Sequence, residues 1–197
     1  MKRASTPVLS VIIVLLFPNI LCAGEIKTVS GWSMTVHAGI MADGDKGTLG
    51  DTISGAEYSG TNNMIMGAVS KELYRYHDIL GFELEGQFGK HGGTNEYYEA
   101  IGAAYIRWLR MPFEEHIRTS VAAGAGLSYA SSIPAVEYRR DQRSENLLGY
   151  LGLEFTVGLP KLPQWDLVFR LHHRSGAKGV IGYGDANYIG AGIKINF

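Results

Sequence analysis

Apolar and polar residues alternate with a period of two along most of this chain. The last segment is the clearest case, because one parity carries the apolar residues Ile189, Ala191, Ile193, Ile195 and Phe197. The other parity carries small or polar residues. Successive side chains of a strand point to opposite faces, so this pattern predicts a strand with one apolar face. No segment shows a sustained period of 3.6 residues, which a helix would require.

The same alternation predicts eight strands, at about 31–41, 63–74, 79–90, 97–109, 116–130, 145–157, 164–175 and 186–197. Each is long enough for the roughly 9–11 residues with which a tilted strand crosses a membrane. Mostly long connections alternate with short turns along the chain. An even strand number, with long loops at one end and short turns at the other, is typical of outer-membrane barrels.

We therefore predict an all-β fold, an eight-stranded antiparallel transmembrane β-barrel of the outer membrane. A sheet in hydrocarbon has to close, because an open edge would leave backbone N–H and C=O groups unpaired. Eight strands leave an interior that side chains can fill, so we expect charges of inward parity to form a paired polar plug rather than an ion path. These charges are Glu83, Glu85, Arg118, Glu154 and Arg170.

The first 23 residues have the features of a cleaved secretory signal: Lys2 and Arg3, an apolar run over 8–20, and Ala23 at the end. Residues 24–197 are then expected to form a single barrel domain. The only cysteine, Cys22, lies in the signal, which excludes disulfide scaffolds, thiol catalysis and thiolate metal sites in the mature chain. With 18 basic and 19 acidic residues, the chain has no basic excess for nucleic acid. A soluble barrel with an apolar interior is the competing fold, and the signal, the loop asymmetry and the terminal Phe197 favour the membrane barrel.

The segment 164–175 carries the candidate chemistry. Its lipid-facing parity is defined by Trp165, Leu167, Phe169 and Leu171. His173 and Ser175 continue that parity, and their backbones are expected to lie roughly 6–7 Å apart, within side-chain reach for a base and a nucleophile. His172 has the opposite parity, so it cannot share a metal with His173 in a regular strand. We expect no metal and no other cofactor.

The following hairpin supplies a third candidate. If the connection is centred near Val180, Ser175 lies opposite Asp185 and His173 lies opposite Asn187. Either Asp185 or Asn187 would then face the same side and accept a hydrogen bond that orients the imidazole. A register slip of one residue would turn both side chains away.

The strand count also predicts the depth of this site. A signal places the amino terminus on the periplasmic side, and eight strands return the carboxyl terminus to that side. The long loops are then extracellular, which puts Ser175 at the depth of the outer leaflet. A substrate that reaches a lipid-facing hydroxyl there is expected to be a lipid, chiefly lipopolysaccharide.

The stretch His173-Arg174-Ser175-Gly176-Ala177, ten residues before a barrel-closing strand, resembles the PagL-type lipid A 3-O-deacylases. Those enzymes are eight-stranded outer-membrane barrels that hydrolyse an ester-linked acyl chain of lipid A with a Ser–His–acid triad on the lipid-facing wall. The resemblance implies His173 as the base and Ser175 as the nucleophile of an acyl-enzyme mechanism. It also implies lipid A as the substrate, and it allows a homodimer.

The chain departs from that family at two positions. The family's acidic residue falls on Asn187, so the residue that orients the imidazole is either Asn187, as a neutral amide, or Asp185. The family's Asn-Ala-Gly segment after the serine is replaced by residues 176–178, Gly-Ala-Lys, and a backbone N–H of Gly176 or Gly179 is expected to supply the oxyanion donor. Two alternatives stay open: a non-catalytic barrel that stabilises the membrane or binds surfaces through its loops, and a narrow pore.

Overall fold

The structure is a computed structural model that describes residues 31–43, 57–94, 96–111, 116–135, 137–138 and 142–197. Eight strands make up most of it: β1 (Gly31–Asp43), β2 (Glu57–Tyr76), β3 (Leu80–Gly92), β4 (Tyr97–Trp108), β5 (Arg118–Ala130), β6 (Leu147–Gly158), β7 (Trp165–Ser175) and β8 (Asp185–Asn196). A one-turn 3₁₀ helix, η1 (Ala177–Gly179), lies between β7 and β8. The described residues contain no helix long and apolar enough to cross a membrane. The predicted signal over residues 1–23 lies outside the described residues.

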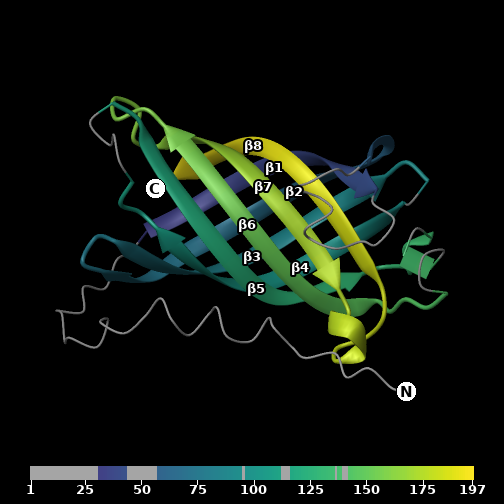
Figure 1. The fold of residues 1–197 in the computed structure, drawn as a ribbon. Coiled ribbons are helices and arrows are strands. Elements are labelled where there is room, and N and C mark those ends of the chain that lie inside the picture. Colours follow the sequence, from purple (N-terminus) through teal and green to yellow (C-terminus); the bar gives the residue numbers. More distant parts are fainter. Residues whose placement is uncertain (1–30, 44–56, 95, 112–115, 136, 139–141) are drawn as a thin grey trace, which may run out of the picture.

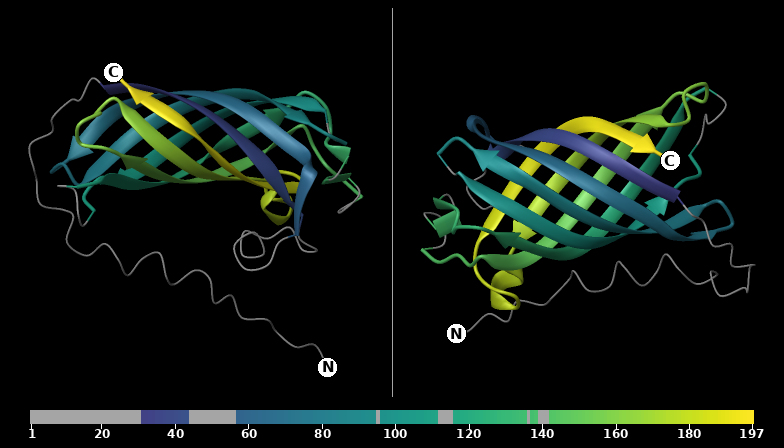
Figure 2. Two further views of the ribbon diagram at one scale, coloured as in Figure 1. Left: turned by 90° about the horizontal axis from the view of Figure 1, so that it is seen from above. Right: turned by 180° about the vertical axis from the view of Figure 1, so that it is seen from behind.

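The strands form one closed antiparallel barrel in sequence order, which confirms the predicted fold (Figure 1). Closure comes from the pairing of β1 with β8, which runs from Ser33 opposite Asn196 to Met41 opposite Tyr188. Beyond the last pair, Trp32 and Phe197 exchange two backbone hydrogen bonds of 2.9 and 2.8 Å. The start of β1 and the end of β8 therefore lie side by side at one end of the barrel (Figure 2).

Seven strands begin and end within two residues of their predicted bounds, and β2 is the exception. We predicted a strand over 63–74, whereas β2 spans Glu57–Tyr76. The register between β1 and β2 shifts between Ile40 and Met41, and pairing then continues to Asp43 opposite Glu57. Because β1 extends past the shift, it supplies hydrogen-bond partners to residues that sequence alternation had assigned to a loop.

Large apolar side chains cover the outside of the barrel. In β4 every second residue is exposed, among them Ile106, which is 49% exposed. The exposed tryptophans Trp32, Trp108 and Trp165 lie at the end of the barrel that carries the short turns, and the exposed tyrosines Tyr58, Tyr98 and Tyr129 lie at the loop end. Aromatic girdles above and below an apolar band are the outer surface of a transmembrane barrel.

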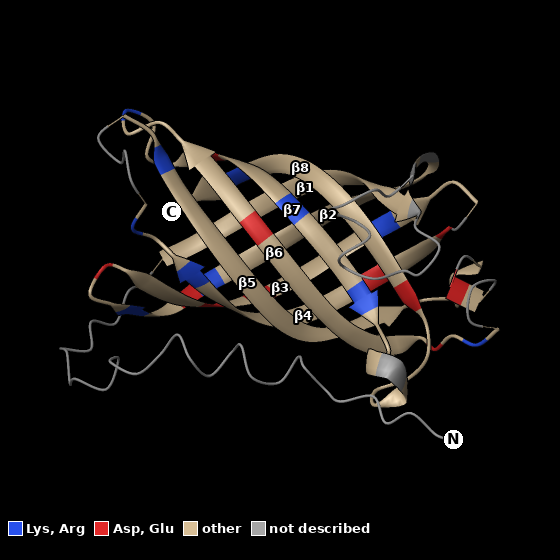
Figure 3. Cartoon of the chain, in the orientation of Figure 1, with Lys and Arg blue, Asp and Glu red and all other residues tan. Residues whose placement is uncertain are grey.

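A network of buried ion pairs fills the half of the lumen that is nearer the short turns. Arg107 binds both carboxylate oxygens of Glu83, at 2.5 and 3.0 Å, and one oxygen of Glu154 at 2.7 Å. Arg170 binds Glu85 at 2.9 and 3.0 Å, and it also donates to Glu154. Figure 3 shows these opposite charges on neighbouring strands such as β6 and β7. The lumen therefore holds a paired plug, as expected from the inward parity.

Arg118 also has a partner, but at the rim of the barrel rather than within the plug. Its guanidinium lies 2.6 Å from the carboxylate of Asp166, and about a third of its side chain is exposed. Asn196 binds the second oxygen of that carboxylate at 2.7 Å.

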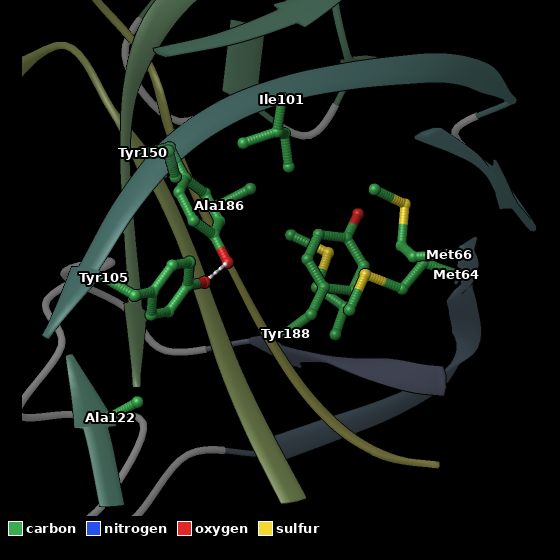
Figure 4. Close-up of a cluster of buried hydrophobic side chains, with 10 residues drawn as sticks. Met64, Met66, Ile101, Tyr105, Ala122, Tyr150, Ala186 and Tyr188 are labelled. Carbon is green, nitrogen blue, oxygen red and sulfur yellow. Dashed lines mark hydrogen bonds between the residues drawn. The ribbon is translucent and has the colours of Figure 1, made fainter. Parts of the chain in front are cut away.

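Tyrosine and methionine side chains form a separate layer nearer the loop end. The hydroxyls of Tyr105 and Tyr150 are 2.8 Å apart, and Tyr188, Met64 and Met66 complete the packing (Figure 4). All five residues are at most 2% exposed. The layer fills this part of the lumen with side chains that pack against one another, as expected in a barrel of eight strands.

Substitution of Glu154 tests how much the buried ion pairs contribute to the free energy of unfolding. Glu154→Leu leaves Arg107 and Arg170 each short of a buried partner, so we expect a loss of about 3–5 kcal/mol in the free energy of unfolding. Urea unfolding of the refolded barrel, followed by tryptophan fluorescence, measures this loss. The matched control is Glu96→Leu, which removes an exposed carboxylate 3.9 Å from Lys90 and should cost less than about 1 kcal/mol. Equal losses in the two variants would contradict a plug that depends on Glu154.

Candidate active site on the outer wall

The β7–β8 hairpin has the register that the sequence predicted. His173 pairs with Asn187 and Ser175 pairs with Asp185, while Leu171 and Ile189 form the next pair toward the barrel centre. Paired residues of an antiparallel sheet point to the same face, so all these side chains lie on the outer wall near the loop end. Trp165, Leu167 and Phe169 continue this face and are 48–55% exposed.

The imidazole of His173 is held by one hydrogen bond. Its Nδ1 lies 2.6 Å from Oδ1 of Asn187, and both residues are buried, with 9% and 1% of their surfaces exposed. An amide oxygen only accepts hydrogen bonds, so Nδ1 carries the proton of the neutral ring. Nε2 is then the unprotonated nitrogen, which is the atom that a general base uses.

Ser175 lies beside this pair without a hydrogen bond to it. Among the described residues, no hydrogen bond joins the Ser175 hydroxyl to His173. The hydroxyl oxygen instead faces the backbone N–H of Ala177 at 3.5 Å. Ser175 is part-exposed, and a change of its side-chain rotamer is the movement that would bring its oxygen toward Nε2. Catalytic hydrogen bonds are often long before substrate binds, which makes the gap compatible with a base and nucleophile.

The backbone N–H groups that the sequence predicted as oxyanion donors are engaged elsewhere. Gly176 N–H donates to the carbonyl of Gly184 at 2.9 Å, and Gly179 N–H donates to the carbonyl of Gly176 at 3.1 Å. The donor nearest the Ser175 hydroxyl is Ala177, whose φ is 49°, in the left-handed region. Sequence reasoning missed it because nothing in the sequence marks a non-glycine residue for that conformation.

Glycine at position 149 leaves room for the β7–β8 loop beside Ser175. Gly149 pairs with Ser175 across β6 and β7 and shares its outward face. A Cβ atom at Gly149 would lie 3.0 Å from Cδ1 of Ile181 and 3.1 Å from the carbonyl oxygen of Ser175. Ile181 therefore packs against the wall beside the candidate nucleophile and forms one side of the site.

An apolar groove of about 890 Å³ on the barrel wall begins directly below the site. Leu171 and Ile189, which form the strand pair next to His173 and Asn187, lie at its upper end. Phe169 and Ala191 continue the lining toward the middle of the membrane band, followed by Ala38 of β1. The groove is large and apolar enough for a hydrocarbon chain, and its end nearest the loops is at Leu171 and Ile189, two residues along the strands from His173 and Asn187.

The neighbouring residues of β7 point to the other side of the wall. His172 and Arg174 are completely buried in the lumen, and the imidazole of His172 lies 3.2 Å from the carboxylate of Glu99. The adjacent histidines 172 and 173 therefore face opposite environments, as the strand period predicts.

Together, the closed barrel, its apolar band and its aromatic girdles define a transmembrane β-barrel of the outer-membrane type and support an integral outer-membrane location. No family model and no curated protein sequence matches the chain. The outer membrane enzyme PagL superposes with a TM-score of 0.56 at 12% identity, over 82% of this chain and 98% of PagL. Neisserial surface protein A superposes with a TM-score of 0.54 at 14% identity, over 87% of this chain and 99% of that protein. One neighbour is described as an enzyme and the other as a surface protein, so the likeness establishes the fold they share.

The tautomer of His173 tests the hydrogen bond that orients it. We expect ¹⁵N imidazole spectra of the folded barrel to show Nδ1 protonated and Nε2 unprotonated in the neutral ring. Asn187→Leu should remove this preference, because the acceptor for Nδ1–H is lost. Asp185→Asn is the control and should leave the tautomer unchanged, since residue 185 pairs with Ser175. The opposite outcome for the two variants would make Asp185 the orienting residue.

Proposed function

We propose that the protein is an outer-membrane esterase that removes an ester-linked acyl chain from lipid A. The observation that carries the proposal is the His173–Asn187 hydrogen bond on the lipid-facing wall, with a serine hydroxyl two residues along the same face. A base with a fixed tautomer beside a hydroxyl is the minimal unit of serine hydrolase chemistry. The resemblance of residues 173–177 to the PagL-type deacylases and the fold shared with PagL support the same activity.

The reaction follows from the protonation state of the imidazole. His173 Nε2 takes the proton of Ser175 as the serine oxygen attacks the ester carbonyl carbon, and the carbonyl oxygen becomes an oxyanion. The tetrahedral intermediate then collapses, the sugar hydroxyl leaves with the proton from His173, and an acyl-enzyme remains. A water molecule, deprotonated by the same nitrogen, attacks the acyl-enzyme and releases the fatty acid. His173 and Ser175 return to their starting states.

Asn187 orients the base but supplies no negative charge. An ionised carboxylate in that place would stabilise the imidazolium that forms in the transition state, whereas an amide oxygen offers only its dipole. Asp185 lies two strand pairs nearer the loop, opposite Ser175 and on the same face. The orientation of the base would then come from Asn187, and a negative charge on that face from Asp185.

Ala177 is the backbone group that we assign to the oxyanion. Its N–H faces the Ser175 oxygen at 3.5 Å and would donate to the carbonyl oxygen once that oxygen occupies the adjacent position. The bonds that Gly176 makes with the chain at 181–184 fix the backbone around it.

The groove below the site is the proposed binding surface for the acyl chain. Leu171 and Ile189 would contact the first methylenes beyond the ester, and Phe169 and Ala191 those further along. In the outer leaflet a lipid A acyl chain already lies along the barrel wall, so binding requires little transfer of apolar surface from water. The sugar would then lie at the level of the extracellular loops, where its charged groups stay hydrated.

A non-catalytic barrel is the second candidate, and two observations favour it. Within the described ranges, no hydrogen bond joins the Ser175 hydroxyl to His173, and the residue that orients His173 is a neutral amide. With such a barrel, loss of the Ser175 hydroxyl would not change the composition of lipid A.

Mass spectrometry of lipid A separates the two candidates. The full chain is expressed in a host that lacks lipid A deacylase activity, and we expect lipid A to lose one ester-linked hydroxyacyl chain. Ser175→Ala should abolish this loss, because the nucleophile is absent. Ser132→Ala is the matched control, since Ser132 is an exposed serine at the same end of the barrel, and it should retain full activity. Unmodified lipid A from folded wild-type barrel would favour the non-catalytic candidate.

Substitution of Asn187 tests whether this residue orients the imidazole of His173. Asn187→Ala should lower kcat by roughly 10²-fold or more, because the base loses its fixed orientation. Asn187→Asp keeps an acceptor for Nδ1–H, adds charge, and should retain or raise kcat. A rate unaffected by Asn187→Ala, measured with purified barrel and lipid A in detergent, would remove Asn187 from the site.

A further inference from the structure

Three lumen residues of the barrel bring metal-ligating atoms together at the loop end. His91 is near the end of β3, Glu99 is near the start of β4, and His172 is on β7. One ligand atom from each lies within 4.8 Å of the others, and all three side chains are completely buried. They come from strands that are not all neighbours in the sheet, so only the closure of the barrel brings them together.

The carboxylate of Glu99 is fixed so that one oxygen faces both imidazoles. Ser128 donates to Oε1 of Glu99 and accepts a hydrogen bond of 2.8 Å from Arg174. Oε2 lies 2.7 Å from Nε2 of His91 and 3.2 Å from Nε2 of His172. Outer-shell bonds of this kind hold first-shell carboxylates in position in metal sites.

Tyrosine rings fix the two imidazoles. His91 stacks on Tyr97 at 4.1 Å between ring centroids and meets the edge of Tyr188 at 4.8 Å. His172 packs edge-on against Tyr150 at 5.1 Å. The rings therefore have little freedom to leave the position in which their Nε2 atoms face Glu99.

Some buried polar atoms of this cluster lack a hydrogen-bond partner among the described residues. In the described part of the chain, neither ring nitrogen of His172 has a hydrogen-bond partner, although its Nε2 lies 3.2 Å from the carboxylate of Glu99. A buried polar atom without a partner is costly in free energy. A divalent cation between the three side chains would accept the lone pairs of both Nε2 atoms and of Oε2 at once.

We propose that His91, Glu99 and His172 form a zinc site inside the lumen. Two imidazoles and one carboxylate are a ligand set that Zn²⁺ takes at about 2.0–2.2 Å, with a water in the fourth position. The three ligand atoms lie within 4.8 Å of one another, so side-chain shifts would bring them to bonding distance of a single ion. The site joins β3 and β4 to β7 across the lumen. It therefore fixes His172 on the inner side of the wall while His173 acts on the outer side.

A cobalt titration tests the proposal with a spectroscopic readout that needs no enzyme activity. The refolded barrel, freed of metal with a chelator, should bind one Co²⁺ per chain with the visible absorption of a tetrahedral site, and Zn²⁺ should displace it. Glu99→Gln and His91→Gln should each weaken binding by roughly 100-fold or more, because each loses one of three ligands. Two variants are used so that a folding defect in one leaves the other as the test, and the mobility of unheated protein on a gel verifies the folded barrel.

Two control variants separate this site from other histidines and from the proposed esterase. His116→Gln removes an exposed histidine in a turn at the opposite end and should bind metal like the wild type. Ser175→Ala should also bind metal normally, whatever it does to lipid A. The proposal is overturned if the folded wild type binds no stoichiometric Co²⁺ or Zn²⁺, or if the ligand variants bind it as tightly as His116→Gln does.

Discussion

The pairing of β1 with β8 closes the sheet into a barrel. It gives every strand two neighbours, so backbone groups in the apolar band are paired without an open edge. Closure also separates the lipid outside from the lumen inside by a wall that is one strand thick. Side chains of one parity meet lipid, and those of the other meet a lumen too narrow for bulk water. The lumen charges then have to be paired with one another, as Glu154 is with Arg107 and Arg170, because neither water nor lipid solvates them.

The same separation gives β7 and β8 two kinds of chemistry. His173 and Asn187 lie on the outer wall, and their chain neighbours His172 and Tyr188 lie in the lumen. The proposed esterase site is on the face that a substrate in the membrane would meet. The imidazole of His172 faces the lumen instead, where it lies 3.2 Å from Glu99. Two hydrogen bonds connect the inner side of β7 to its neighbours across the lumen, from Arg174 to Ser128 of β5 and from Ser128 to Glu99 of β4. These bonds hold β7 in position, while its outer face carries the candidate site.

The sequence predicted most of the fold because a period of two residues carries both the strand assignment and the face of each side chain. It also predicted the β7–β8 register, since Ser175 and Asp185 are symmetric about a single turn. The six extra residues at the start of β2 could not be predicted, because their pairing depends on a register shift between β1 and β2. Ala177 was missed because its left-handed backbone arises from the loop around it. The cluster of His91, Glu99 and His172 was missed because the contact of β7 with β3 and β4 depends on strand stagger, which alternation does not encode.

The proposed function requires that Ser175 is a nucleophile activated by His173 on the lipid-facing wall. The most direct measurement is covalent labelling of the folded barrel by a long-chain alkyl fluorophosphonate, located by peptide mass spectrometry. We expect one adduct per chain, on Ser175, formed at a rate that falls strongly in His173→Ala. Absence of an adduct from folded wild-type protein, or labelling of Ser175 at the same rate without His173, would contradict the proposed function.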